Sequence, residues 1–420
     1  MQERIQRGEA RLLGPFYVYM FVAVTTMAVF PFMVIYFLDL GFTFSQYFVL
    51  IGVWTAGTVF FEVPTGVVAD SHSRKWSVIT GLAIAGVSAI GLGLTDSYPL
   101  LLALFAINGI GFTFFSGAED AWAIDNLYHY DRGDLITAFY AKNQAIMYLG
   151  MVAGPLAAGA IVAVWGIRPL WFIWGGGYLL TAAGLTLMAE HYTPERRTVP
   201  TALGQTFKQT GEAMRLLKSD RNLGLAFVAT AFMALLFLDN GFWQPLLVDL
   251  DLPVAGIGYV TAGAALVGAV VSLIIPRLGR FDFRVLLASG IVTKMILLVA
   301  VPLLYGPRYV IASAMFVALE ATGTLEGPLL NPYIQQRLPS RLRATAVSIK
   351  SMLFKVLMGV GGITLGIVAD RTSLRTVFPI IAVSGFGALW ALSRMDRGQP
   401  PHSADPDSEQ PELALPATAV

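Results

Sequence analysis

The sequence predicts an all-α membrane protein with twelve transmembrane helices in two pseudo-symmetric six-helix bundles. Of the 420 residues, 56% are hydrophobic and only 13% are charged, whereas soluble domains carry about 25% charged residues. Apolar stretches of about 20 residues recur along the chain, and each can cross a hydrocarbon core of about 30 Å as a helix. One long polar interval divides these stretches into six and six.

The predicted spans are 12–38, 45–69, 76–95, 98–128, 133–164, 168–189, 223–248, 254–278, 284–305, 308–337, 342–369 and 374–394. The first stretch is too long for the apolar core of a secretory signal, about 7 to 15 residues, so we expect it to be retained as a helix. The predicted domains are an N-terminal bundle (1–189), a linker (190–222), a C-terminal bundle (223–395) and a tail (396–420). The tail is rich in Pro, Ser and acidic residues, which is typical of disorder.

The linker contains apolar residues at near-helical spacing beside basic ones. The apolar positions are Leu203, Phe207, Met214 and Leu217, and the basic ones are Lys208, Arg215 and Lys218. This pattern predicts an amphipathic helix on a membrane surface. A solvated linker without a membrane contact is the alternative.

The basic residues are distributed unevenly between the two predicted sides of the membrane. Arg168, Arg308, Arg371 and Arg375 lie in loops on one side, whereas most other loop Lys and Arg group with the N-terminus and the linker. By the positive-inside rule, both termini and the linker are predicted to be cytoplasmic. The expected location is the cell inner (plasma) membrane, which the chain crosses many times.

Composition argues against several other partners. The net charge of +1 gives no reason to expect nucleic acid. The chain has no Cys, which excludes disulfides and thiolate metal sites, and its four His residues fall in predicted loops or the tail. We therefore expect no metal and no cofactor.

An internal repeat appears at an offset of 207 residues. Residues 154–173 align with residues 361–380, which places helices 5 and 6 over helices 11 and 12; Gly154 falls on Gly361. Two such halves are the sequence trace of a transporter built by duplication, with its binding site between the halves near the bilayer midplane.

The segment GVVADSHSRK, residues 66–75, lies in the predicted loop between helices 2 and 3. It resembles the signature loop of the major facilitator superfamily, G-x-L-a-D-r-x-G-r-k. Ser71 and Ser73 replace the usual Arg and Gly. Together with the spans and the repeat, this resemblance covers essentially the whole chain.

A carboxylate at a helix end can accept hydrogen bonds from the free backbone donors at a neighbouring helix N-terminus. The resemblance implies that Asp70 caps the start of helix 11, that Gly66 permits close approach, and that Arg74 pairs with Asp125. With Lys75, these residues form a predicted cytoplasmic gate that holds the halves together in the outward-open state. Generic basic charge at a cytoplasmic loop is the alternative.

Helix 5 carries a second pattern of small residues. Gly150, Gly154, Pro155 and Gly159 resemble the G-x-x-x-G-P-x-x-G-G element of antiporters, with Ala158 in place of one Gly. Small residues at this spacing allow tight helix contacts in lipid. The resemblance implies export, and packing without any directional meaning is the alternative.

Two departures from the family pattern concern proton coupling. The membrane-embedded Arg that usually precedes the G-x-G of helix 4 is missing before Gly109. Helix 1 also lacks the acidic residue that many drug/proton antiporters carry before Pro31. The usual coupling pair is therefore not available in this chain.

Ionisable residues inside predicted spans are costly and mark functional sites by default. Antiparallel neighbouring helices place residues at equal depth when their numbers have a constant sum. The pairs matched in this way are Glu119 with Lys142, Glu320 with Lys355, and Glu326 with Lys350. Glu62 and Asp120 complete the candidate set for proton coupling or gating, Lys294 has no obvious partner, and static ion pairs are the alternative.

Helix 7 concentrates polar and aromatic residues in its outer half. The resemblance places helices 1, 4, 7 and 10 around the cavity, so the candidate substrate contacts are Asp239, Asn240, Trp243 and Gln244, with Asn108 from helix 4. An interfacial aromatic belt is the alternative. Asp239, with no Lys at matching depth, is the rival proton carrier.

Taken together, these features predict a secondary active transporter that works by alternating access. We expect a monomer that exports a small amphipathic or drug-like molecule in exchange for protons. Proton-coupled uptake of a small nutrient is the alternative. An enzyme is disfavoured because the sequence has no H-E-x-x-H, G-x-S-x-G or P-loop motif, and a receptor because it has no sizeable soluble domain.

Overall fold

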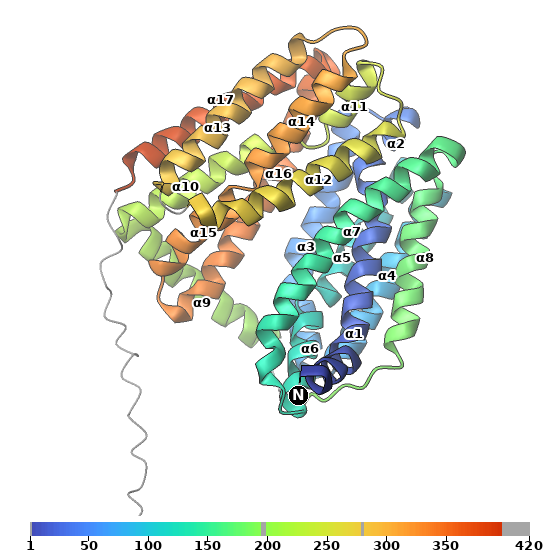
Figure 1. Cartoon of the computed structure of the whole chain (residues 1–420), viewed down its shortest axis with the longest axis vertical. Coiled ribbons are helices and arrows are strands. Elements are labelled where there is room, and N and C mark those ends of the chain that lie inside the picture. Colours follow the sequence, from blue (N-terminus) through green and yellow to red (C-terminus); the bar gives the residue numbers. More distant parts are fainter. Residues whose placement is uncertain (1, 195–198, 279–280, 397–420) are drawn as a thin grey trace, which may run out of the picture.

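The computed structural model describes residues 2–194, 199–278 and 281–396, and every regular element in these ranges is a helix. Figure 1 shows two bundles, one built from the first half of the chain and one from the second. The predicted disordered tail lies outside the described residues, apart from its first residue, Asp396.

The N-terminal bundle contains α1 (Gln2–Thr26), η1 (Met27–Phe32), α2 (Met33–Asp39), α3 (Phe44–Ser71), α4 (Arg74–Leu94), α5 (Tyr98–Phe115), α6 (Ala118–His129), η2 (Gly133–Leu135), α7 (Ile136–Trp165) and α8 (Pro169–Leu185). Side-chain caps fix where helices begin. Thr43 and Gln46 form a capping box before α3, and Ser73 caps α4. Such caps satisfy backbone donors that have no partner within the helix.

The C-terminal bundle contains α10 (Arg221–Leu236), η3 (Phe237–Asp239), α11 (Trp243–Asp249), α12 (Gly256–Ile274), η4 (Ile275–Leu278), α13 (Phe283–Ala300), η5 (Val301–Leu303), α14 (Tyr309–Gly323), α15 (Glu326–Gln336), α16 (Ser340–Arg371) and α17 (Leu374–Arg394). Eleven helical segments of the described chain are long and apolar enough to cross a membrane. With α8, a helix of 17 residues, they match the twelve predicted spans, and the predicted fold class is confirmed.

The first, fourth, seventh and tenth spans are each interrupted near their middle. The first is broken at η1, which contains Pro31, and the tenth between α14 and α15. The fourth and seventh break at Gly117 (φ 81°) and Gly241 (φ 97°), positions where only glycine is free of steric strain. Discontinuous helices are the usual frame of a transporter's binding site.

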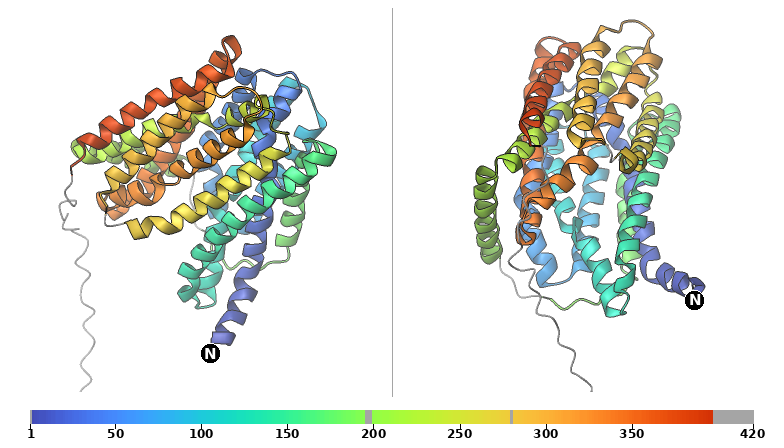
Figure 2. Two further views of the ribbon diagram at one scale, coloured as in Figure 1. Left: turned by 45° about the horizontal axis from the view of Figure 1, so that its top comes forward. Right: turned by 60° about the vertical axis from the view of Figure 1, so that its left-hand side comes forward.

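The linker contains one helix, α9 (Val199–Ser219), which lies at the edge of the molecule in Figure 2. It packs against α16, α10 and α3. Ala213 and Leu217 face the protein, whereas Met214 is 42% exposed. The side chains of Leu203 and Phe207 lie outside the described set, so the contact of this helix with a membrane surface stays a prediction.

The two bundles converge at one end of the molecule and diverge at the other (Figure 1). We call the end at which α1 begins the N-terminal face and the opposite end the distal face. At the distal face, the Phe48 ring of α3 lies 4.9 Å from the Phe242 ring of the other bundle. In addition, the Asp370 carboxylate of α16 accepts hydrogen bonds from the backbone N–H groups of Phe44 and Ser45. The distal face is therefore closed.

Candidate functional site

A central cavity with two adjoining lobes lies between the bundles. Both lobes are lined by Phe30, Tyr47, Phe237 and Asn240. Phe30 belongs to η1 of the first span, and Phe237 and Asn240 lie at the break of the seventh. The interrupted helices thus place backbone and side-chain polar groups at the cavity.

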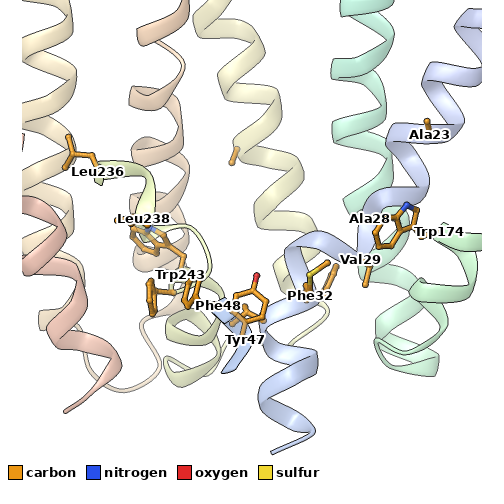
Figure 3. Close-up of a cluster of buried hydrophobic side chains, with 14 of the residues drawn as sticks. Ala23, Ala28, Val29, Phe32, Tyr47, Phe48, Trp174, Leu236, Leu238 and Trp243 are labelled. Carbon is orange, nitrogen blue, oxygen red and sulfur yellow. The ribbon is translucent and has the colours of Figure 1, made fainter. Parts of the chain in front are cut away.

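The smaller lobe, about 170 Å³, is mostly aromatic. Its aromatic lining residues are Phe30, Tyr47, Phe48, Trp54, Phe105, Trp174 and Phe237. Figure 3 shows Tyr47 and Phe48 between Trp243 of the C-terminal bundle and Phe32 of the first span. Asn108 also lines this lobe; its Oδ1 accepts a hydrogen bond from Trp54 Nε1 at 3.0 Å. The predicted cavity position of Asn108 therefore agrees with the geometry.

The larger lobe, about 440 Å³, is more polar. Its polar lining residues are Tyr47, Tyr148, Asn240, Gln244, Thr261, Glu320 and Thr324. Among the described residues that line the two lobes, Glu320 is the only charged one. Gln244 Oε1 and Glu320 Oε1 are buried without a hydrogen-bond partner in the described structure. Unpaired buried acceptors at a cavity are available to a substrate or a proton.

Asp239 and Trp243 line neither lobe in this structure, and their role as direct substrate contacts stays a prediction. Both side chains are fully buried, and Trp243 Nε1 donates to Asp239 Oδ2 at 2.6 Å. The Trp243 ring packs edge-on against Phe316 and Phe378. The turn at Gly241 directs Asn240 to the cavity and leaves its neighbours in the bundle core.

Asp239 has a basic partner, contrary to the sequence-based expectation. Lys294 Nζ of α13 lies 3.1 Å from Asp239 Oδ1, and both side chains are buried. Glu320 lies within electrostatic range of this pair. The depth rule missed the contact because it compared only consecutive spans, whereas Asp239 of η3 lies in the seventh span and Lys294 of α13 in the ninth. Asp239, Lys294 and Glu320 are called the acidic cluster below.

The predicted pairing of Glu119 with Lys142 is wrong. Glu119 accepts a hydrogen bond from the Tyr19 hydroxyl of α1, and Lys142 Nζ lies 2.6 Å from Glu9 Oε1, also on α1. The half-buried Asp120 lies beside Glu119. The reason is that α7 packs mainly against α12 and α1, so α1 supplies the facing partners.

Of the two remaining predicted ion pairs, one forms as predicted and the other does not. Lys350 Nζ contacts Glu326 Oε1 at 2.8 Å, as predicted. Lys355, however, contacts Glu62 at 3.1 Å and not Glu320. The main neighbour of α16 is α3 of the other bundle, which explains the error. Glu62 therefore belongs to the charge network through a contact that joins the two halves.

The predicted gate lies at the N-terminal face. Arg74 Nη1 lies 2.7 Å from Asp125 Oδ2, the predicted partner, and 3.4 Å separates Arg74 from the Asp70 carboxylate. Lys75 Nζ donates to backbone carbonyls just before the linker. A Cβ added at Gly66 would meet nothing within 4 Å, so the predicted close approach there is absent from this structure.

The small residues of helix 5 lie at two helix crossings. Cβ atoms added at Gly150 and Gly154 would meet α1, at 3.0 Å from Val24 and 2.7 Å from the Thr25 carbonyl oxygen. One turn further, Gly159 approaches α12 of the other bundle, where an added Cβ would lie 2.8 Å from the Ala255 carbonyl oxygen.

Pro155 takes part in the same crossing, because its carbonyl oxygen contacts the position that a Cβ of Gly258 would occupy. The C-terminal part of the helix 5 element therefore helps to close the distal face.

Comparison with known proteins agrees with this architecture. A family model described as Major Facilitator Superfamily matches residues 16–362. The uncharacterized MFS-type transporter YxaM of Bacillus subtilis (strain 168) is 20% identical over 370 residues, which cover 84% of this chain and 88% of the relative.

Two solved structures share the fold. The nucleoside transporter NupG is similar with a TM-score of 0.73 at 15% identity, over 92% of this chain and 100% of that one. A bacterial homolog of the human lysosomal transporter Spinster, in an inward-facing and unoccupied conformation, gives a TM-score of 0.70 at 15% identity, over 91% of this chain and 95% of that one.

Proposed function

Because this chain belongs to the major facilitator superfamily, we propose that it exports a small amphipathic molecule by alternating access, in exchange for protons. Its membership makes it a multi-pass membrane transporter. The observation that carries the finer proposal is the two-lobed cavity between the bundles, with aromatic rings in one lobe and Glu320 in the other. Such a lining suits a molecule that has an apolar ring system and one polar or cationic group.

The N-terminal face is assigned to the cytoplasm and the distal face to the outside. The distribution of Lys and Arg supports this orientation. Since the bundles meet at the distal face, the structure corresponds to an inward-open state in the proposed cycle. The cavity would then exchange substrate with the cytoplasm.

The acidic cluster is the proposed coupling site. Glu320 is the member that faces the cavity, while Asp239 and Lys294 are paired behind it. A buried carboxylate is neutralised either by a cation or by a proton. A cationic group of the substrate and a proton would therefore compete for Glu320, and this competition links the two fluxes in opposite directions.

The other charge pairs have a proposed gating role. Glu62 with Lys355 joins the halves, and Glu326 with Lys350 holds the inner part of the C-terminal bundle. Neither pair lines the larger lobe.

The proposal is tested with purified protein in liposomes. A thermal-shift screen first selects a compound that raises the melting temperature, since a ligand of the native state stabilises it. Flux of that compound is then measured under an imposed pH gradient. An antiporter accumulates the compound in vesicles with an acidic lumen, whichever way the protein is inserted.

The same assay evaluates the alternative, proton-coupled uptake of a small nutrient. The polar groups of the larger lobe favour it, because Asn240, Gln244 and Thr261 could bind hydroxyl or amide groups. A symporter would accumulate its substrate when the lumen is alkaline and the outside acidic. That result would overturn export, and flux without any dependence on the gradient would overturn coupling.

A further inference from the structure

One sequence pattern occurs twice, at opposite faces of the molecule. GVVAD, residues 66–70, ends near the C-terminus of α3, and GIVAD, residues 366–370, ends near the C-terminus of α16. Three residues after each aspartate, a serine caps the next helix: Ser73 caps α4 and Ser373 caps α17.

A basic residue also follows the capping serine in both loops, directly after Ser73 in the first and two residues after Ser373 in the second. Arg74 lies at the start of α4 and contacts Asp125 at 2.7 Å. Arg375 lies at the start of α17 and contacts Asp249 at 2.5 Å. Each guanidinium also lies 4.3 Å from the centre of a tyrosine ring. The two loops therefore share a structure as well as a sequence.

The two copies face opposite sides because α3 and α16 are antiparallel and pack against each other. Transporters of this superfamily combine two repeated halves with an inverted repeat inside each half, so that helices 1–3 and 10–12 are inverted copies. The C-terminus of each helix therefore lies on the same face of the molecule as the N-terminus of the other.

At the distal face, the copy of the pattern on α16 contacts the start of α3. Asp370 Oδ1 and Oδ2 accept hydrogen bonds from Phe44 N at 2.8 Å and Ser45 N at 3.0 Å. These are free donors at the N-terminus of α3, where the helix dipole favours a negative charge. The backbones are close, since a Cβ added at Gly366 would lie 2.9 Å from Ser45 Cα.

At the N-terminal face, the copy on α3 is open. The Asp70 carboxylate lies 3.4 Å from the Arg74 guanidinium on its own side of the molecule, and the Asp70 side chain is 34% exposed. Gly66, the counterpart of Gly366, has open space around it. The N-cap residue of α16, Pro339, provides no side-chain cap.

We infer that Asp370 is a positioning residue that latches the outer face by capping α3. It alternates with the inner contact that the family resemblance implies for Asp70 at the start of α16. The inference rests on the proposed alternating access. Because α3 and α16 remain packed along their middle, rocking that separates one pair of ends brings the other pair together. One latch therefore replaces the other, and their difference in strength sets the resting population.

The test measures the populations directly with pairs of spin labels on introduced cysteines, since the chain has no native Cys. The labels at Ser97 and Pro307 report the outer face, and those at Asp131 and Gln336 the inner face. Asp370→Ala is expected to lengthen the outer distance and shorten the inner one. The ratio of outward-open to inward-open molecules should rise by about tenfold, as expected for a lost hydrogen bond to a charged group.

Two further variants make the result specific. Asp70→Ala combined with Asp370→Ala should return the ratio toward that of the parent protein, because both latches are then missing. Asp96→Ala is the matched control: it removes an outer carboxylate that pairs with Arg168 within the N-terminal bundle, and it should leave both distances unchanged.

Unchanged distances in Asp370→Ala would overturn the inference, and so would a double variant no closer to the parent than the single one. Should Asp370→Ala fail to fold, Asp370→Asn removes the charge but keeps one acceptor oxygen, and it must shift the ratio in the same direction. These distances need neither substrate nor pH gradient. A failure of proton-coupled export in the parent protein would therefore count against the proposed function only.

Discussion

Glu320 is the charged side chain that faces the larger lobe, and the proposed coupling depends on it. Replacing it by Gln keeps the shape but removes the group that exchanges a cation for a proton. We expect Glu320→Gln to lose accumulation driven by an acidic lumen and to bind a cationic substrate more weakly, while it keeps downhill exchange at saturating substrate. The pH-driven flux and the exchange of labelled for unlabelled substrate are measured in the same vesicles.

The matched control is Glu119→Gln. Glu119 is an equally embedded acid, but it is bound to Tyr19 within the N-terminal bundle. It should retain pH-driven flux. If Glu119→Gln abolished this flux and Glu320→Gln did not, coupling would belong to the N-terminal bundle.

The side chains of Asp239 and Lys294 are buried together, so each charge depends on the other for its neutralisation. Removing one partner of a buried pair costs about 3–5 kcal/mol, since the other charge is left uncompensated. Lys294→Met should lower the free energy of unfolding by about this amount, measured by denaturant unfolding in detergent micelles.

A double variant tests whether the loss of stability arises from the uncompensated charge. Lys294→Met with Asp239→Asn leaves no uncompensated charge at position 239, and the neutral amide can still accept from Trp243. The double variant should regain most of the lost stability. A double variant as unstable as Lys294→Met would mean that the lysine acts through packing and not through charge.

At the scale of elements, the crossing of α7 and α12 closes the distal face. Gly258 contacts the carbonyl of Pro155 so closely that no Cβ fits. Gly258→Ala should push the helices apart and disfavour the closed outer face by about 1–3 kcal/mol, the usual cost of overpacking. The outer distance between labels at positions 97 and 307 should lengthen.

The same helix offers a control. An added Cβ at Gly263 meets nothing within 4 Å, so Gly263→Ala should leave the outer distance unchanged. Equal effects of the two substitutions would show that a general change in helix propensity, and not the crossing, is responsible.

The helical spans could be predicted from the sequence because hydropathy is a local property of about 20 residues. The ion pairs could not be predicted in this way, because the partner of a charged side chain depends on which helices pack against each other in the fold. Glu326 with Lys350 was found within one hairpin. Lys355 instead faces α3, almost 300 residues away, where Glu62 lies.

The residues that line the cavity were also only partly predictable from the sequence. The polar segment of helix 7 pointed to the right place, yet a turn at Gly241 separates Asn240 and Gln244 at the cavity from Asp239 and Trp243 in the core. A turn of this kind changes which side chains face inward. The outer latch, in contrast, had a signal in the sequence: GIVAD at 366–370 repeats GVVAD at 66–70.

At the scale of the whole molecule, the two bundles meet at the distal face and separate at the N-terminal face. The role proposed for each face therefore depends on the orientation of the protein in the membrane. The proposed direction of transport, the assignment of Asp70 as the inner latch and that of Asp370 as the outer one all depend on which face is cytoplasmic. The larger lobe would open to the outside if the orientation were reversed.

Orientation is tested by labelling single cysteines in intact cells with a membrane-impermeant maleimide. Ser97→Cys lies at the distal face, between α4 and α5, and His72→Cys lies at the N-terminal face, between α3 and α4. Because basic loops are retained in the cytoplasm, position 97 should react in intact cells and position 72 only after the cells are opened. The cysteine-free parent is the control for background labelling. The reverse pattern would place Asp370 inside and Asp70 outside, so the two latches would exchange faces and the structure would represent an outward-open transporter.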